Sequence, residues 1–303
     1  MMQRYTHHGL TWIDLETPTR NEVRELVDEF GIDSLVADEL LLPTAKPRFE
    51  RHENMLYLIL HFPALHHTHH SAEQEIDFVV GKEFIITTRY DMIDPLHKFS
   101  KTFEVGEMTG TSGIGDHAGY ILYFILRSLY VAVDHEVEYV RTSLHDIEEQ
   151  VFEGREKEMV AAISHAGRDL LALRQAVEPH RDMLQEMEIA GRAFWGDTFA
   201  PYLRGIVNEY YRVHNHIMRN TESLHELRET NNSLLSTKQN EIMKTFTIMA
   251  FVTFPLMLVT SAFGMNTVHT PIIGAPFDFW IVIGIMLGST IGLYLFFKLK
   301  KWL

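Results

Sequence analysis

The sequence predicts an α+β membrane protein with an N-terminal α/β domain, a long helical stalk and two C-terminal transmembrane helices. Three observations predict this architecture. Runs typical of β-strands are confined to the first third of the chain, long helical patterns follow them, and the segment from Thr245 to Phe297 contains a single charged side chain, Asp278.

Composition narrows the class of partner. The 303 residues include 41 acidic and 27 basic side chains, a net charge of −14, and no cysteine. This acidity argues against a nucleic-acid partner, because phosphate binding needs clustered Lys and Arg. The absence of Cys excludes disulfide bonds and thiolate chemistry.

Residues 1–115 are expected to form the α/β domain. Strands are predicted over residues 10–15 and 56–62, and in a hairpin over 76–88. Thr19 is placed to cap a helix over residues 21–30. The Gly81-Lys82 pair in the hairpin lacks the upstream glycine and spacer of a phosphate-binding loop, so we expect no nucleotide partner.

Helical periodicity dominates residues 116–197, which we expect to form antiparallel acidic helices. An apolar helix begins near Tyr120 and continues into an acidic stretch that ends at Glu153. Gly154 breaks the pattern, and one further helix is predicted over residues 157–190.

The segment 198–245 is predicted to be a stalk helix with a coiled-coil-like seam. Apolar positions alternate four and three residues apart, a 3.5-residue repeat that three polar positions interrupt. The seam consists of Ile206, Tyr210, Val213, Ile217, Asn220, Leu224, Leu227, Asn231, Leu234 and Lys238. Such a repeat favours association of identical helices, and an intramolecular helical bundle is the alternative.

Two apolar runs, residues 246–263 and 279–297, are each long enough to cross a bilayer, since about 20 helical residues span its hydrocarbon core. Buried core helices are usually shorter and keep a polar stripe, so we predict two transmembrane helices. Lysines precede the first run and fill the tail 298–303, whereas the loop 264–278 has no Lys or Arg. The positive-inside rule then predicts a multi-pass protein of the cell membrane with both termini in the cytoplasm.

The first run closes on Phe263-Gly264-Met265-Asn266. With this motif the chain resembles the CorA family of magnesium and cobalt channels, which carries Tyr-Gly-Met-Asn at the same place. Further stretches resemble the family pattern at residues 12–15, 78–82, 240–244 and 300–303, and at Pro255 and Pro271. The resemblance implies a homopentamer with a funnel of stalk helices, in which the first membrane helices line the pore. It also implies a transport protein, not an enzyme, for passive uptake of Mg²⁺, with Co²⁺ and Ni²⁺ as further ions.

The resemblance assigns the selectivity filter to Gly264, Met265 and Asn266. A ring of Asn266 carbonyl groups would accept hydrogen bonds from the water around Mg²⁺, which loses its hydration shell reluctantly. The alternative for Asn266 is a helix C-cap. By the family pattern the pore-lining residues are Asn240, Met243, Phe246, Thr247, Ala250, Phe254 and Ser261.

The sequence matches the regulatory Mg²⁺ site of the family on one side only. Asp91 and Asp94 stand where the family binds regulatory Mg²⁺, but Gly205 replaces the acidic residue expected on the other side of that site. A histidine cluster of His66, His67, His69 and His70 would suit Zn²⁺, Co²⁺ or Ni²⁺, because imidazole prefers transition metals, and the alternative is a polar loop. A Zn²⁺ transporter of the ZntB type and a non-conducting membrane scaffold therefore remain alternatives to the magnesium channel.

Overall fold

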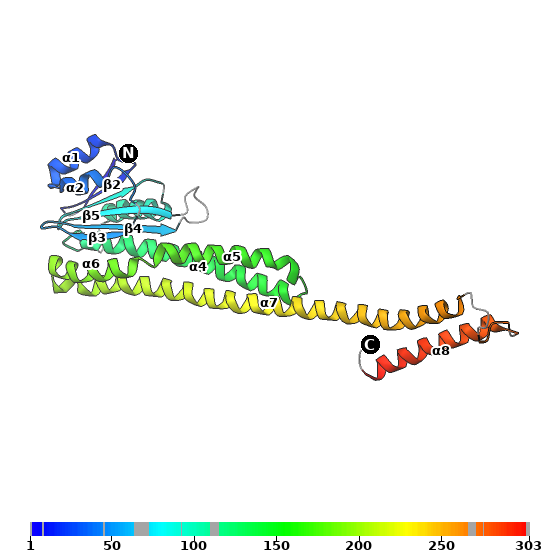
Figure 1. Cartoon of the computed structure of the whole chain (residues 1–303). Helices are drawn as coiled ribbons and strands as arrows, with labels where there is room; N and C mark the ends of the chain where they lie inside the picture. The colour runs from blue at the N-terminus through cyan, green and yellow to red at the C-terminus, as the bar shows by residue number, and fades with distance from the viewer. Residues whose placement is uncertain are drawn as a thin grey trace. The chain divides into compact units, whose positions relative to one another are not determined.

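Figure 1 shows the computed structural model of the chain. The structure describes residues 2–7, 9–44, 46–63, 73–91, 93–109, 115–265, 271–274 and 276–300. The chain divides into two compact units, Met1–Arg228 and Glu229–Leu303, and helix α7 (Ala200–Phe263) contributes residues to both.

The first unit contains a six-stranded sheet with the order β1-β2-β6-β5-β4-β3. Its strands are β1 (Met2–His7), β2 (Leu10–Glu16), β3 (Arg48–Arg51), β4 (Leu56–Pro63), β5 (Glu73–Val80) and β6 (Phe84–Arg89). Strands β2 and β6 are parallel and the other neighbours are antiparallel. The predicted hairpin is present, with Val80 paired to Ile85 across the turn.

Helices α1 (Arg20–Phe30) and α2 (Ser34–Glu39) cover one face of this sheet (Figure 1). Helix α1 begins where the sequence predicts, because Thr19 and Glu22 form a reciprocal capping box that pairs two backbone N–H groups at the helix start. The layer buries a core that includes Leu15, Leu26 and Ile59. Burial of these apolar side chains holds the helices on the sheet.

Several helices pack against the other face of the sheet, among them α3 (Asp94–Thr109) and α4 (Gly119–Phe152). Trp12 lies on this face, with its ring centroid 5.6 Å from that of Phe103 in α3. Phe62 of β4 lies 5.7 Å from Tyr130 of α4. These aromatic contacts join the sheet to the helical layer.

The helical part of the first unit also contains α5 (Glu156–Val177), α6 (His180–Trp195), a 3₁₀ turn (Asp197–Phe199) and the start of α7. The prediction of one helix over residues 157–190 was therefore wrong, because α5 ends and α6 begins around Glu178 and Pro179. Pro179 has no backbone N–H to donate to the preceding turn, which interrupts the helix.

The seam of α7 packs within its own chain over residues 206–227. Ile206, Val213 and Ile217 are at most 1% exposed. Asn220 donates its side-chain N–H to the backbone oxygen of Val137 in α4 at 3.1 Å. The preference for self-association was thus wrong for this stretch, where the seam forms the intramolecular bundle.

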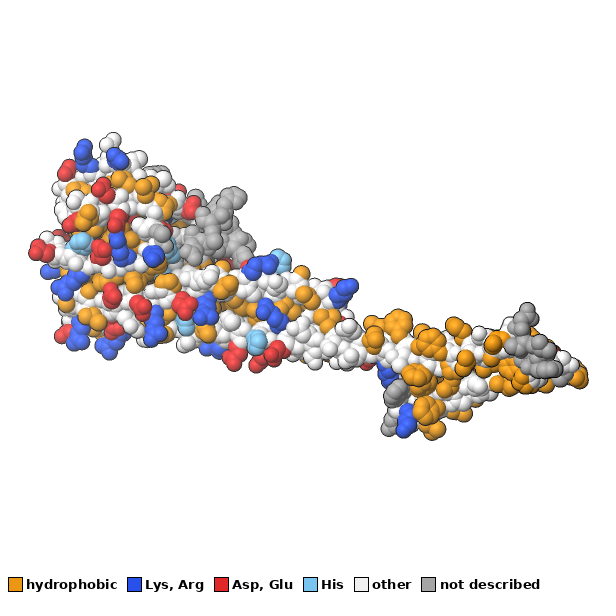
Figure 2. All heavy atoms as spheres, viewed as in Figure 1, with side chains coloured by type: hydrophobic (Ala, Val, Ile, Leu, Met, Phe, Trp, Pro, Cys, Tyr) orange, Lys and Arg blue, Asp and Glu red, His pale blue; other side chains and the backbone are white. Residues whose placement is uncertain are grey.

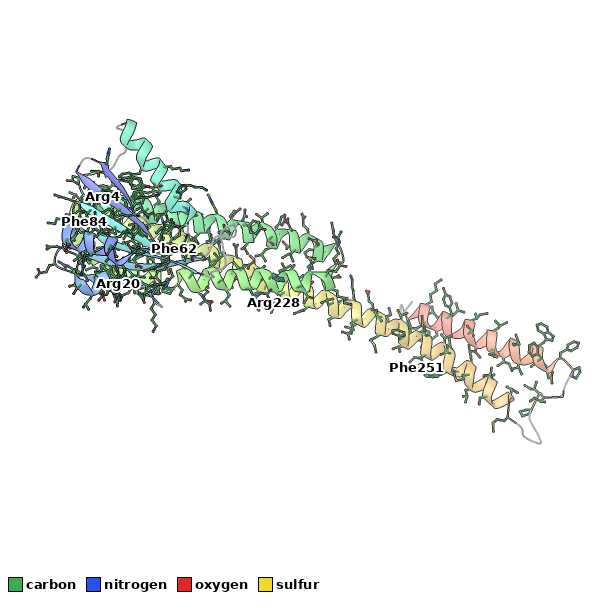
Figure 3. The ribbon with its side chains drawn as sticks, turned by 90° about the horizontal axis from the view of Figure 1, so that it is seen from above. Arg4, Arg20, Phe62, Phe84, Arg228 and Phe251 are labelled. Carbon is green, nitrogen blue, oxygen red and sulfur yellow. The ribbon has the colours of Figure 1, made fainter. Side chains whose placement is uncertain are left out.

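The second unit consists of the C-terminal part of α7 and helix α8 (Asp278–Leu299), which lie side by side (Figures 1 and 3). Within the described residues, α7 and α8 are the two helices that are long and apolar enough to cross a membrane. Almost none of either apolar stretch is buried. Figure 2 shows hydrophobic side chains gathered over the surface of this second unit, whereas charged side chains are spread over the surface of the first.

Candidate functional site

The residues assigned to the pore share one face of α7. At 3.6 residues per turn, Asn240, Met243, Thr247, Ala250, Phe254 and Ser261 fall within one third of the helix circumference, with Phe246 at its edge. Every one of them except the half-buried Ala250 is exposed. We call this surface the free face of α7.

The opposite face of α7 is the one that α8 covers. Its half-buried side chains, about half a turn from the free face, are Ile248, Val252, Leu256, Val259 and Phe263. On α8 the less exposed side chains also share one face, and they are Val282, Ile283, Met286, Ser289, Thr290, Leu293 and Phe297. Phe251, labelled in Figure 3, lies between the two faces of α7, and its ring centroid is 6.3 Å from that of Phe297. Contact with α8 therefore leaves the free face uncovered.

Hydroxyl groups along this part of α7 are turned back onto the helix. Thr247 donates to the backbone oxygen of Met243 at 2.8 Å, and Thr253 donates to Met249 at 2.9 Å. A hydroxyl hydrogen engaged in this way leaves only lone pairs for other partners. On the free face, the Thr247 oxygen can therefore only accept further hydrogen bonds.

Helix α7 ends at the predicted motif. The N–H of Gly264 donates to the backbone oxygen of Thr260 at 2.9 Å, and Met265 is 59% exposed. A Cβ atom at Gly264 would lie 3.1 Å from that same oxygen, so a side chain would crowd the helix end. Asn266 lies outside the described residues.

Beyond the motif, Asp278 organises the start of α8. Its Oδ2 accepts a hydrogen bond from the N–H of Gly274 at 3.1 Å. The neighbouring Phe277 has a φ of 74°, in the left-handed region that side chains other than glycine rarely adopt. Asp278, the one acidic residue of the apolar segment, thus stabilises the turn that contains the strained backbone of Phe277.

The candidate regulatory residues are only partly placed. Asp91 is half-buried, and its backbone oxygen accepts a hydrogen bond from Nη1 of Arg89 at 3.1 Å. Asp94 is the first residue of α3. At Gly205 a Cβ atom would lie 3.1 Å from Cε2 of Tyr123, so the ring of Tyr123 occupies the space beside this position.

Within the described ranges, no three His, Asp or Glu side chains are grouped so that they could hold a metal ion. The cluster His66, His67, His69 and His70 falls outside those ranges. Sequence reasoning missed two pairs of side chains, which lie on opposite faces of the sheet. They are the pair of His180 and Tyr130, and the pair of Glu75 and Asp77.

His180 connects α6 to the sheet. It is fully buried, with Nε2 lying 2.9 Å from the backbone oxygen of His61 and Nδ1 lying 2.9 Å from the hydroxyl of Tyr130. A carbonyl oxygen only accepts, so Nε2 carries the hydrogen and Nδ1 accepts from Tyr130. Burial lowers the pKa of His180 to about 4, which keeps the imidazole neutral.

The comparisons with known proteins agree with the resemblance in the sequence. The chain is 25% identical to the cobalt/magnesium transport protein CorA of Thermotoga maritima, over 97% of this chain and 83% of that protein. The complete CorA magnesium transporter of Methanocaldococcus jannaschii has the same fold, with a TM-score of 0.84, 19% identity, and coverage of 99% of this chain and 93% of that one.

The cytoplasmic domain of ZntB from Vibrio parahaemolyticus is also similar in fold, with a TM-score of 0.53 and 15% identity, over 76% of this chain and 87% of that one. A family model described as "CorA-like Mg2+ transporter protein" matches residues 7–300, which is nearly the whole chain. The match takes in strands β2 to β6, the long helix and both apolar helices, and on this ground the chain belongs to the CorA-like family of Mg²⁺ transporter proteins.

Proposed function

We propose that this protein is a channel for divalent cations, with Mg²⁺ as the principal ion and Co²⁺ and Ni²⁺ as further ions. Five copies would surround a pore lined by the free face of α7, with both termini in the cytoplasm. Gly264, Met265 and Asn266 would form the filter at its outer end.

The observation that carries the proposal is the free face itself. It is the side of α7 that α8 leaves uncovered, and it leads along the apolar segment to the Gly-Met-Asn motif. Membership of the CorA-like family supports the assignment to divalent cations. A helix with one face against its own hairpin partner can pack identical copies around an axis with its other face.

The residues of the free face suit a hydrated ion. Met243, Phe246 and Phe254 would form apolar rings that close by dewetting when the pore narrows. Asn266 and Thr247 would supply oxygen atoms that accept hydrogen bonds from the water around the ion, without removing that water. Entry of a doubly charged ion through about 100 mV releases about 4.6 kcal/mol, so uptake needs no other energy source.

The test is ion flux into liposomes that contain the purified full-length protein, with Mg²⁺, Co²⁺, Ni²⁺ and Zn²⁺ compared. We expect Asn266→Ala to reduce Mg²⁺ uptake to that of protein-free liposomes, because the ring of acceptor oxygens is lost. Asn232→Ala, at an exposed position of α7 before the apolar segment, is the matched control and should transport normally. Normal uptake by Asn266→Ala would contradict the filter assignment.

The same experiment separates the alternatives. Preferred flux of Zn²⁺ would indicate a transporter of the ZntB type, for which the histidine cluster is the motivating observation. Absence of flux for every ion would indicate a non-conducting scaffold. That alternative is motivated by Gly205, where Tyr123 fills the space beside the position that carries an acidic residue in the family pattern.

A further inference from the structure

Two acidic side chains lie next to each other inside the α/β domain. Glu75 and Asp77 are two residues apart on β5, so both point to the face of the sheet that α1 and α2 cover. Glu75 is 8% exposed and Asp77 is fully buried. Two buried carboxyl groups side by side need either positive partners or a proton.

The two groups have different surroundings. Glu75 accepts hydrogen bonds from the N–H of Thr44 at 2.8 Å, from the hydroxyl of Thr44 at 3.0 Å and from Nε2 of His61 at 3.1 Å. Asp77 receives one, from the hydroxyl of Tyr90 to its Oδ2 at 3.3 Å. Donors from Thr44 and His61 stabilise Glu75 as a carboxylate, and the position of Asp77 favours a neutral acid.

The second oxygen of Asp77, Oδ1, is buried and has no donor among the described residues. The neighbouring carboxyl group on the same face of β5 is that of Glu75, two residues away. Two carboxylates only accept, so a hydrogen bond between them requires that one of them carries a proton. A proton on Asp77 supplies the missing donor and satisfies Oδ1 at the same time.

Among the described neighbours, no positively charged group pairs with Asp77. Arg48 of β3 binds the carboxylates of Glu39 in α2 and of Glu50, so its charge is already matched. The remaining neighbours are the phenols of Tyr57 in β4 and Tyr90 after β6, and the imidazole of His61, which binds Glu75. None of the phenols brings a positive charge.

We propose that Glu75 and Asp77 form a proton-binding site and share one proton. While that proton is bound, the hydrogen bonds from Thr44 to Glu75 hold the segment after α2 against the sheet. The directions in which the pKa values of Asp77 and Glu75 are shifted agree with this proposal. Burial and the charge of Glu75 raise the pKa of Asp77 well above its usual value. Burial opposes ionisation of Glu75, but the hydrogen bonds from His61 and Thr44 outweigh it and lower its pKa.

The hydrogen bonding between Glu75 and Thr44 therefore depends on pH. While Asp77 is protonated, Glu75 is free to hold the backbone and hydroxyl of Thr44. Loss of the proton places two negative charges side by side in a buried site and pushes Glu75 away from its partner. Because the pKa of Asp77 is raised on folding, its contribution to stability is present at low pH and is lost as the pH rises through the folded-state pKa.

Infrared spectroscopy of the full-length protein in detergent tests the proposal directly. We expect a carbonyl band of a protonated, buried carboxyl group at neutral pH, and its loss in Asp77→Asn. The matched control is Asp14→Asn, on the opposite face of the same sheet, since Asp14 binds Arg89 at 3.1 Å and needs no shared proton. Loss of the band in Asp14→Asn but not in Asp77→Asn, or no band in the wild type, would overturn the proposal.

Hydrogen exchange of the peptide that contains Thr44 gives a second readout. After correction for intrinsic rates, we expect its protection in the wild type to fall as the pH rises, and to stay constant in Asp77→Asn, where an amide replaces the protonated acid. In Glu75→Gln the infrared band should disappear at a lower pH, because Asp77 no longer faces a negative charge. A pH dependence of Thr44 protection that is unchanged in both variants would contradict the shared proton.

Discussion

Buried polar side chains join the layers of the α/β domain. Asp14 lies between the side chains of Arg89 and Thr87 on one face of the sheet, and Glu75 and Asp77 lie on the other. In the sequence these acids alternate with apolar residues, which is typical of a strand with one solvated face. They are buried instead because helices cover both faces, and no local pattern distinguishes the two cases.

His180 allows a prediction for acid pH. The unfolded chain takes up a proton on this imidazole near pH 6.5, whereas the folded chain resists until about pH 4. Stability is therefore lost as the pH falls through this window, by about 1.4 kcal/mol for each pH unit. His180→Gln keeps an N–H donor for the His61 carbonyl but cannot be protonated, so it should flatten the dependence of the free energy of unfolding on pH between 4 and 6.5.

Thermal unfolding of the wild type and the variant across this range is the measurement. His145→Gln, on the exposed surface of α4, is the control, and its stability should depend on pH as that of the wild type does. An equally steep loss of stability in His180→Gln would mean that another group titrates.

At the scale of elements, α7 shows how one helix serves two environments. Over residues 206–227 its apolar seam is buried against its own chain, while the free face farther along is exposed and apolar. The sequence predicted the helix and its end at Phe263, since both follow from local periodicity and from Gly264. Periodicity alone did not reveal which partner covers each face, because an apolar stripe fits any apolar surface.

Two threonines on α7 test which face lines the pore. Thr247 and Thr253 make the same hydrogen bond to the preceding turn, but Thr247 lies on the free face and Thr253 does not. We expect Thr247→Val to reduce Mg²⁺ flux at least fivefold, because a lost hydrogen-bond acceptor is worth about 1 kcal/mol, or about fivefold. Thr247→Ser, which keeps the hydroxyl, should restore flux, and Thr253→Val should leave it unchanged in the liposome assay. Equal loss in both valine variants would assign the pore to a different face.

At the scale of the whole molecule, the two units differ in what stabilises them. The first unit has cores on both sides of its sheet, whereas almost none of the apolar stretches of the second is fully buried in the single chain. Lipid and further copies of the chain are the apolar surroundings that such helices require. The proposed pentamer would supply both.

The division between the units leads to a prediction for assembly. Ile217 is 1% exposed within its own chain, so Ile217→Ala should lower the free energy of unfolding by about 2–5 kcal/mol without changing the number of copies per particle. Light scattering of the detergent-solubilised protein should give five copies for both the wild type and the variant. A smaller particle for Ile217→Ala would show that the seam joins copies after all.

Much of the architecture follows from the sequence. Strands β2 and β4, the hairpin of β5 and β6, the capped helix α1 and the two apolar helices were predicted from alternation, capping residues and length. The break at Pro179 was missed because helical spacing on both sides continues in phase with little interruption. The short elements β1, β3 and α2 were missed because few residues carry their pattern.

By itself, the sequence determined the order of the elements, the two apolar helices and the motif that ends α7, since each depends on neighbouring residues. The tertiary structure alone decided that the seam of α7 packs within the chain and that one face of α7 remains free beside α8. It also decided that Glu75 and Asp77 are both buried on the face of the sheet that α1 and α2 cover. These outcomes depend on which distant surfaces come together, and burial then changes the chemistry of the side chains between them.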